Sequence, residues 1–236
     1  MPRKHLVASQ TNKKQQLQAK LWQKLAREIK AAVKVGGTNI EANPRLKAAV
    51  DKALQNNLSR DSIERNINGS HKDSNELSVK EFECYGPSGI QIVVSALTDN
   101  INRTISNLNG YLSKLHGQIA KPNSVKIFFD NVGYIVIYKS NISVDKIMET
   151  TLDYNIIDII EQEDAIEIKT NPGDFYKVKD VLTTIGVKIF NSEIRLLPQN
   201  PIESLDSDTK TRLEKFIDSC DQDDDIQWVV TNYEGE

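Results

Sequence analysis

Residues 132–198 read VGYIVIYKSNISVDKIMETTLDYNIIDIIEQEDAIEIKTNPGDFYKVKDVLTTIGVKIFNSEIRLLP. Short runs rich in β-branched and apolar residues alternate here with two segments whose apolar residues fall on one helical face. The resulting order, strand–helix–strand–strand–helix–strand, is the ferredoxin-like βαββαβ arrangement. We expect a strand at Tyr134–Tyr138, a helix at Val144–Leu152, strands at Ile156–Ile160 and Ala165–Ile168, a helix at Phe175–Ile185 and a strand at Val187–Leu197.

The segments on either side of this stretch belong together. Before it, the turn Gly86-Pro87-Ser88-Gly89 joins two β-rich runs and predicts a hairpin, because its glycines and proline supply special backbone angles. After it, one helix and one strand remain, too little to enclose a core. We therefore predict that 132–200 is inserted into a middle domain. Its expected elements are strands at Phe82–Tyr85, Ile90–Leu97 and Val125–Phe129, a helix at Asn100–Leu115, a helix at Leu205–Cys220 and a strand at Ile226–Val230.

The N-terminal third predicts a small bundle of three helices. Leucine and isoleucine recur every four residues over 15–35, and Gly36-Gly37 ends that helix. Asn43 with Pro44 starts a second helix, and Ser59 caps a short third one. The polar stretch His71–Asn75 reads as a linker. The sequence thus predicts an α+β protein with a basic helical domain at 1–75, a discontinuous middle domain at 76–131 and 201–236, and an inserted ferredoxin-like domain at 132–200.

Charge divides the chain unevenly. Residues 1–75 carry 15 Lys and Arg against 6 Asp and Glu, a net charge of +9, and residues 76–236 carry a net charge of −12. A polyanion partner for the N-terminal end is one interpretation. A solvated basic surface is the other. The cations and the polar residue that could contact phosphates are Lys20, Lys24, Arg27, Asn43, Arg45, Lys52, Arg60 and Arg65.

Patterns for other chemistry are missing. The Gly86–Gly89 turn lacks the lysine and the glycine spacing of nucleotide-binding loops. The acidic run 221–225 lacks the glycine and glutamate of a calcium-binding loop and reads as a solvated turn. Three isolated histidines and two distant cysteines indicate neither a catalytic group, a zinc site nor a disulfide. We expect no enzyme, no metal and no cofactor. No apolar run reaches the length of a membrane span and the start is polar, so we expect a cytoplasmic protein.

Three blocks resemble the YebC/PmpR family, which includes a mitochondrial translational activator of cytochrome c oxidase. They are Asn43–Leu54 running on to Arg65, Tyr85–Gly89 with Leu97–Asn100, and Asp224–Gln227 with Asn232-Tyr233. The resemblance spans nearly the whole chain. Two departures stand out: the extreme N-terminus is less basic than in the family, and Ser88 occupies a position where the family's turn has glycine. A positive φ there would strain a serine.

The resemblance implies three domains, no enzymatic activity and a cytoplasmic, DNA-binding transcriptional regulator. The alternative it implies is a ribosome-associated factor that contacts ribosomal RNA and eases stalls such as those at proline runs. A third class, a ferredoxin-like module for a small ligand or for protein assembly, stays open. We expect a monomer with no small-molecule substrate. Carried over by position, the candidate inter-domain or binding residues are Tyr85, Gly86, Asp99, Asn100 and Arg103, beside Asn43, Arg45, Lys52 and Arg65.

Overall fold

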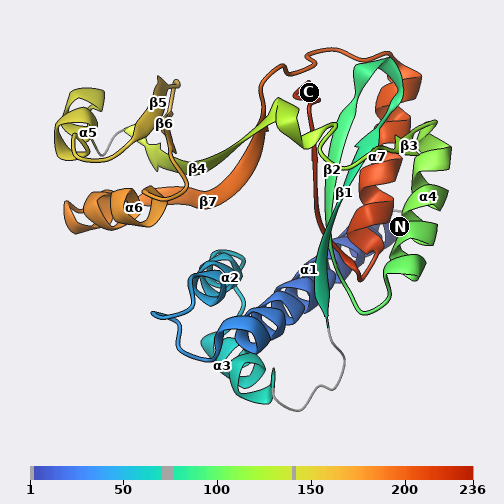
Figure 1. The fold of residues 1–236 in the computed structure, drawn as a ribbon, viewed down its shortest axis with the longest axis horizontal. Helices are drawn as coiled ribbons and strands as arrows, with labels where there is room; N and C mark the ends of the chain where they lie inside the picture. Colours follow the sequence, from blue (N-terminus) through green and yellow to red (C-terminus); the bar gives the residue numbers. More distant parts are fainter. Residues whose placement is uncertain (1–2, 71–76, 140–141, 236) are drawn as a thin grey trace. The chain divides into compact units, whose positions relative to one another are not determined.

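The fold is that of a computed structural model, which describes residues 3–70, 77–139 and 142–235, with residues 3–16 described by their backbone alone. The chain forms helices and two antiparallel sheets, so the predicted α+β class is confirmed (Figure 1). It divides into two compact units, one of residues 1–126 and 201–236 and one of residues 127–200. Within the described ranges, no helix combines the length and the apolar character needed to cross a membrane. The predicted linker lies at 71–75, outside the described residues.

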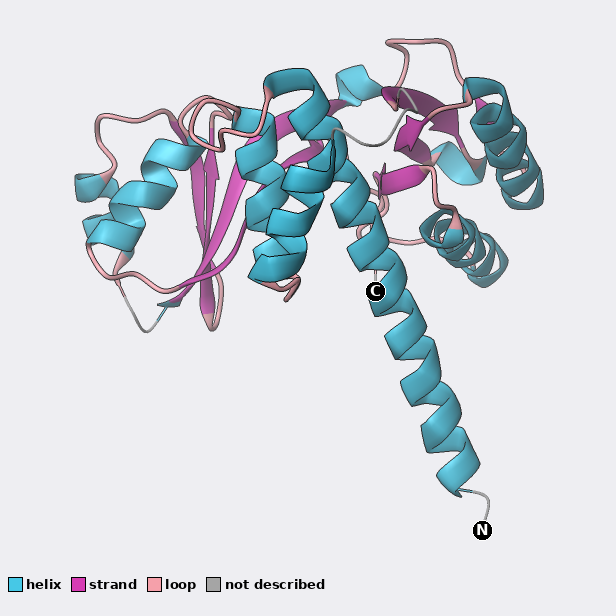
Figure 2. Cartoon of the chain, turned by 90° about the horizontal axis from the view of Figure 1, so that it is seen from below, coloured by secondary structure: helices cyan, strands magenta, loops and turns pink. Residues whose placement is uncertain are grey.

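The first unit begins with helices α1 Arg3–Gly36, α2 Pro44–Gln55 and α3 Arg60–Gly69. α1 is one long helix that begins before the predicted start at residue 15 (Figure 2). It ends where predicted, because Gly37 follows with a φ of +82°, the left-handed conformation that suits glycine after a helix. The predicted caps are also confirmed, since Asn43 and Ser59 accept the first free N–H groups of α2 and α3. The three helices share a core of Leu25, Ile29, Ala32, Val33, Leu46, Ala49, Val50, Ala53, Leu58, Ile63 and Ile67.

A four-stranded sheet forms the rest of the first unit. Its strand order is β3-β1-β2-β8, with β1 Ser78–Tyr85, β2 Gln91–Thr98, β3 Gln118–Ile119 and β8 Ile226–Thr231. The helices α4 Ile101–Leu115 and α7 Ser207–Gln222 lie side by side against one face of this sheet (Figure 1). β2 lies between β1 and β8 and is almost entirely buried, so the C-terminal strand completes a sheet begun more than a hundred residues earlier.

The turn between β1 and β2 has a positive φ at Ser88, the position where the related family has glycine. Ser88 has φ 54° and ψ 30°, inside the short 3₁₀ helix η2 Pro87–Gly89, and Gly89 follows at φ 79°. A left-handed conformation disfavours any residue with a β-carbon. Serine therefore occupies a position where glycine costs less.

The second unit has its own sheet and core. Its elements are β4 Phe129–Tyr138, α5 Val144–Thr150, β5 Ile156–Glu161, β6 Ala165–Thr170, α6 Phe175–Thr184 and β7 Ile189–Pro198. The sheet order is β5-β6-β4-β7 and each neighbouring pair is antiparallel. The element order is βαββαβ, as predicted from the sequence. The core contains Ile135, Ile137, Ile147, Ile166, Ile168, Phe175, Val178, Leu182 and Val187.

One predicted strand is wrong. Residues 125–129 were expected to be extended, but Lys126–Phe128 form the short 3₁₀ helix η3 and β4 begins at Phe129. The reason lies in Glu83, whose carboxylate accepts the N–H groups of Val125 and Lys126 at 2.5 and 2.8 Å. Those donors are therefore unavailable to a strand ladder. The two-residue strand β3 was not predicted, because so short a run carries no periodic signal.

Candidate nucleic-acid interface

Three exposed cations on α2 and α3 remain available for contact with a polyanion. Lys52, Arg60 and Arg65 all have exposed side chains. Arg65 is held along its own helix, where it donates to the carbonyl of Asp61 and to the hydroxyl of Ser62 at 3.1 Å each. Among the described residues, Lys52 and Arg60 form no ion pair. Their charges are therefore not neutralised by a neighbouring carboxylate.

Arg45 has a positioning role in addition to its charge. Its Nε and Nη2 atoms donate to Oε1 of Glu28 at 3.0 and 2.9 Å, which ties α2 to α1. Both side chains are about one-third exposed. Arg45 therefore reaches the surface, but its charge is partly balanced by Glu28 before any partner arrives.

Asn43, which the sequence placed among the contact residues, is buried. Its amide nitrogen donates to the carbonyls of Ala32 and Gly37 at 2.9 Å each, and its oxygen accepts the N–H of Leu46 at 3.1 Å. These bonds join the end of α1 to the start of α2. Asn43 shapes the loop between the helices and is only 4% exposed, so the structure gives it a capping role and does not present it for the predicted contact.

Lys20, Lys24 and Arg27 differ from the exposed cations of α2 and α3 because each bonds to the C-terminal region, although the side chain of Lys20 is 39% exposed and pairs with Asp224 at 3.8 Å. They lie on the part of α1 that contacts the turn between α7 and β8. Lys24 is only 7% exposed and donates to the carbonyl of Cys220 at 3.2 Å. Burial is the main reason that its pKa lies below the usual lysine value, and Asp221 and Asp223 oppose the shift. Lys20 donates to the carbonyl of Gln222.

Arg27 completes this contact. Its guanidinium donates to the carbonyl of Leu97 at 3.1 Å, to Oδ1 of Asp225 at 3.3 Å and to the carbonyl of Asp224. The predicted set of phosphate contacts thus splits in two. One part, on α2 and α3, faces solvent, and the other part holds α1 against the C-terminal region.

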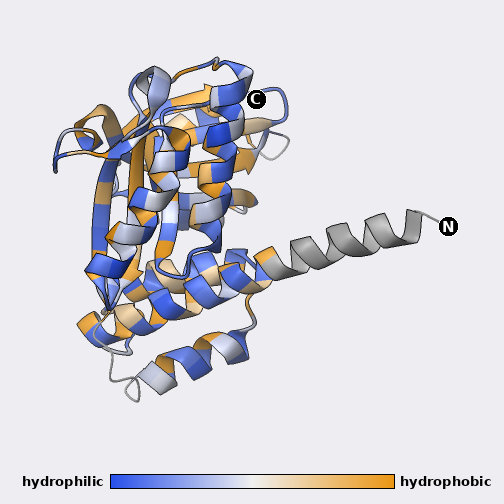
Figure 3. Ribbon diagram, turned by 90° about the vertical axis from the view of Figure 1, so that its right-hand side faces the viewer, coloured by the Kyte–Doolittle hydropathy of each residue, from blue (hydrophilic) through white to orange (hydrophobic). Residues whose placement is uncertain are grey.

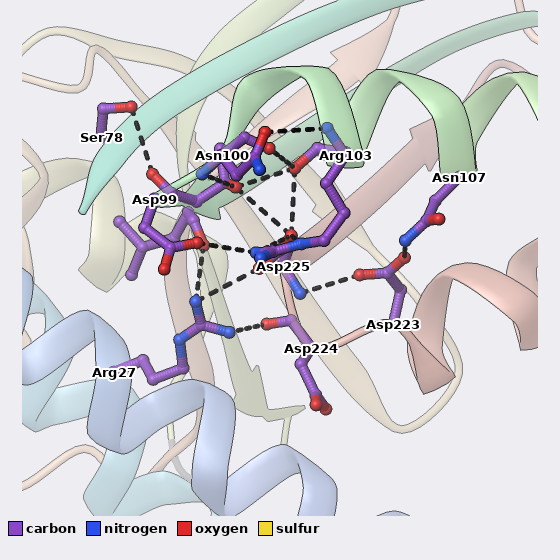
Figure 4. Close-up of polar contacts among 12 residues, drawn as sticks. Arg27, Ser78, Asp99, Asn100, Arg103, Asn107, Asp223, Asp224 and Asp225 are labelled. Carbon is purple, nitrogen blue, oxygen red and sulfur yellow. Dashed lines mark hydrogen bonds and ion pairs between the residues drawn. The ribbon is translucent and has the colours of Figure 1, made fainter. Parts of the chain in front are cut away.

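Asp225 is the centre of a polar network beside this contact (Figure 4). Its carboxylate is 4% exposed and accepts Nε and Nη2 of Arg103 at 3.0 and 2.7 Å. It also accepts the hydroxyls of Thr104 and Thr98 at 3.1 and 3.3 Å. Burial alone would raise the pKa of Asp225. The hydrogen bonds from Arg103 and Thr104 outweigh burial, and the pKa lies below the usual aspartate value.

The segment Asp99–Arg103 contributes to the same network. Arg103 bonds to Asp99 at 2.8 Å, one turn away, and Asn100 caps α4 by accepting the N–H of Arg103 at 3.1 Å. The hydrogen bonds that Arg103 donates to Asp225 and then to Asp99 raise its pKa. This segment therefore joins the start of α4 to Asp225, the residue before β8.

The acidic run 221–225 is only in part the solvated turn that the sequence suggested, because Asp223 and Asp225 are buried. Asp223 is 8% exposed, and its Oδ2 accepts Nδ2 of Asn107 and the hydroxyl of Tyr111 at 3.0 Å each. Burial first, and the bond to Asp223 second, raise the pKa of Tyr111 to about 12. A shallow cleft of about 460 Å³ opens over this network. Its walls are largely side chains that already bond to one another, so it offers few free donors to a ligand.

Tyr85 and Gly86 lie far from the Asp99–Arg103 segment. They stand at the opposite end of the β1–β2 hairpin, separated by the eight residues of β2, or roughly 25 Å at the rise of an extended strand. The hydroxyl of Tyr85 donates to the carbonyl of Ser124 at 2.8 Å. The structure thus does not bring the five predicted residues into one site.

Two residues of structural importance were missed by sequence reasoning. Asp225 was set aside with its acidic run, although it falls inside one of the family-like blocks. Glu83 is buried and accepts three backbone N–H groups, from Asn123, Val125 and Lys126, within 2.8 Å. Those bonds outweigh burial and lower its pKa. Nothing in the sequence distinguished it from the neighbouring charges Lys80 and Glu81 on the same strand.

The cysteines are inert. Cys84 and Cys220 are both buried and unbridged. Burial raises the pKa of Cys84 to about 12 and raises the pKa of Cys220 further. Thiols in such surroundings are poor nucleophiles. Among the described residues, no group of His, Cys, Asp and Glu is arranged to hold a metal ion.

Comparison with known proteins gives one consistent answer. Residues 3–73 match the TACO1/YebC protein N-terminal domain, and residues 77–233 match the TACO1/YebC second and third domain. A probable transcriptional regulatory protein of Ureaplasma parvum is 55% identical over the full length of both chains. One of Photobacterium profundum is 39% identical over 98% of this chain and 92% of its own.

A solved structure agrees with these matches. The crystal structure of a conserved hypothetical protein from Aquifex aeolicus has a TM-score of 0.77 and 31% identity, and covers 92% of this chain and 90% of its own. The family matches together cover almost every residue of both compact units. The chain therefore belongs to the TACO1/YebC family, several members of which are named probable transcriptional regulatory proteins.

Proposed function

We propose that this protein is a non-enzymatic regulator of gene expression that binds nucleic acid through the exposed cations of α2 and α3. The observation that carries the proposal is the pair Lys52 and Arg60, which are exposed and form no ion pair with any described carboxylate. Cations in this state can displace the counterions of a phosphate backbone. The names of its relatives, as transcriptional regulators, support the same direction.

We favour DNA as the partner. The protein would act in the cytoplasm as a monomer. Backbone contacts of this kind fix position and carry no sequence information, so α2 and α3 would supply affinity rather than specificity. Ribosomal RNA has the same phosphate chemistry. A ribosome-associated role in translation is therefore the competing outcome, and the experiment below separates the two.

We also propose that the chain has three domains. We place a basic helical domain at 1–75, a discontinuous middle domain interrupted by the second compact unit, and an inserted domain that starts near Ile127 rather than at residue 132. The support for the earlier start is β4, which pairs with β7 from Phe129 onward. An insertion that leaves and re-enters at neighbouring points can keep its own core.

The test compares two probes under one set of conditions. Labelled duplex DNA and purified ribosomes are titrated with the full-length protein between about 50 and 200 mM salt. The variant Lys52→Gln/Arg60→Gln should bind more weakly and show a flatter dependence on salt. A matched control is Lys146→Gln/Lys177→Gln, which removes the same charge from exposed side chains in the second unit.

The outcomes are distinct. Binding to duplex DNA that ribosomes do not compete away favours a transcriptional regulator. Retention on ribosomes in the presence of excess DNA favours a translation factor. Equal binding by the variant and its control would remove α2 and α3 from the interface, and no binding of either probe would overturn the proposed function.

A further inference from the structure

We propose a second phosphate-binding surface on the first unit, in the groove between α4 and α7, which takes the backbone of the nucleic acid. This inference rests on the proposed function and adds a site that lies outside the basic N-terminal third. The groove has a volume of about 470 Å³. It is lined by Tyr111, Lys114, Arg212, Lys215, Phe216, Asp218, Ser219 and Gln222.

The helical repeat places the groove's polar side chains in two facing rows. On α7, Arg212, Lys215, Ser219 and Gln222 follow one another at steps of three or four residues, and so share one side of the helix. On α4, Lys114 lies one turn beyond Tyr111. The two helices pack directly against each other, and Figure 3, which views them from outside, shows mostly hydrophilic residues along them.

The charges in the groove are unusual for this part of the protein. Lys114 and Lys215 are exposed, and within the described ranges neither forms an ion pair. Arg212 is balanced by Asp208 at 2.7 Å, and Asp218 is the one carboxylate in the lining. The groove thus has a local excess of positive charge, although residues 76–236 have a net charge of −12. Such an excess attracts a polyanion and repels other acidic groups.

Other cations of the same region are already occupied. Arg103 bonds to Asp225 and Asp99, and Lys126 bonds to Glu81. The two groove lysines differ from these, since no described carboxylate holds them in place. A lysine that gains a phosphate partner here does not first have to leave an internal one. This is the same property that distinguishes Lys52 and Arg60.

The groove also adjoins the helical region. Gln222 lines one end of it, and the carbonyl of Gln222 accepts the Nζ atom of Lys20 on α1. This end of the groove therefore lies next to α1, although the exposed side chains of Asp221 and Asp224 flank it. The described cations without an ion pair that a nucleic-acid backbone meets in the groove are the two lysines, while the hydroxyl of Tyr111 is taken by Asp223 and that of Ser219 by the carbonyl of Lys215.

The experiment uses the full-length protein and the variant Lys114→Gln/Lys215→Gln. Its binding to a labelled duplex, and separately to purified ribosomes, is measured between about 50 and 200 mM salt. Loss of two phosphate contacts should lower the slope of log affinity against log salt by roughly 1.8 and weaken binding about tenfold per lysine at low salt. Lys146→Gln/Lys177→Gln is the charge-matched control, and Lys114→Arg/Lys215→Arg should retain the wild-type slope.

Each result decides a different point. A groove variant that matches the control, while Lys52→Gln/Arg60→Gln is impaired, overturns the groove and leaves the proposed function standing. A wild-type protein that binds neither probe overturns both. Circular dichroism on every variant checks that the fold is retained, and the arginine variant separates loss of charge from loss of structure.

Discussion

Arg27 on α1 and Asp225 at the start of β8 bond across 3.3 Å, although 198 residues separate them in the sequence. This contact joins the helical region to the sheet, and the same carboxylate holds Arg103 on α4. One buried acid therefore couples three elements of the first unit. Its removal would leave two guanidinium groups without their shared partner.

Asp225→Ala should destabilise the protein by about 2–4 kcal/mol, because it removes a buried carboxylate that accepts hydrogen bonds from two arginines and two threonines. Urea unfolding followed by circular dichroism measures the change. Asp224→Ala is the control, since that neighbouring side chain is 76% exposed and should change stability by less than about 0.5 kcal/mol. Similar values for the two variants would contradict the central role of Asp225.

Lys24→Met should leave nucleic-acid binding unchanged. The ammonium of Lys24 is buried against the carbonyl of Cys220, so a polyanion cannot reach it. Methionine keeps the length of the side chain and removes its charge. Lys52→Met makes the same chemical change at an exposed position and should weaken binding. Anisotropy titrations of both variants test the point, and weakened binding by Lys24→Met would restore the prediction made from the sequence.

The predictions made from the sequence succeeded for features that depend on residues close together in the chain. Asn43 and Pro44 place the start of α2 because a cap and the first helical residue act within one turn. The internal partners of Lys20, Lys24 and Arg27 could not be predicted, for the opposite reason. Their helical spacing shows that they share a side of α1, but the turn that covers this side comes almost 200 residues later. The spacing of residues along a helix does not identify a partner so distant in the sequence. A buried lysine and an exposed one therefore look alike there.

The stability of the protein should fall as the solution becomes acidic. Glu83 and Asp225 both have lowered pKa values, Glu83 because its bonds to backbone N–H groups outweigh burial. A carboxyl with a lowered pKa stabilises the fold above its unfolded pKa, about 4.3 for glutamate, and this stabilisation is lost as the pH falls through the folded value. Glu83→Gln should therefore be less stable than wild type at pH 7 and should lose less stability on acidification. Parallel curves of unfolding free energy against pH would exclude this role.

Ser88→Gly should stabilise the protein by about 0.5–1 kcal/mol. Ser88 has a φ of 54°, and removal of its β-carbon relieves more strain than the added freedom of the unfolded chain costs. Ser88→Val should destabilise, because a β-branched residue tolerates this conformation least. Thermal unfolding should give the highest Tm for the glycine variant, a lower one for the wild-type serine and the lowest for the valine variant. Any other order would show that the turn, and not the residue, sets the conformation.

A fragment of residues 127–200 should fold on its own, because the second unit has a closed set of strand pairs and a separate core. A shorter fragment, 132–200, starts at the boundary suggested by the sequence and lacks the first residues of β4. These residues pair with β7 through Phe129 and Pro198, and Phe129 is buried. The shorter fragment should be less stable by about 1–3 kcal/mol, as the loss of a buried aromatic residue and its strand pairs implies. Cooperative urea unfolding of the two fragments tests this, and equal midpoints would move the boundary back to residue 132.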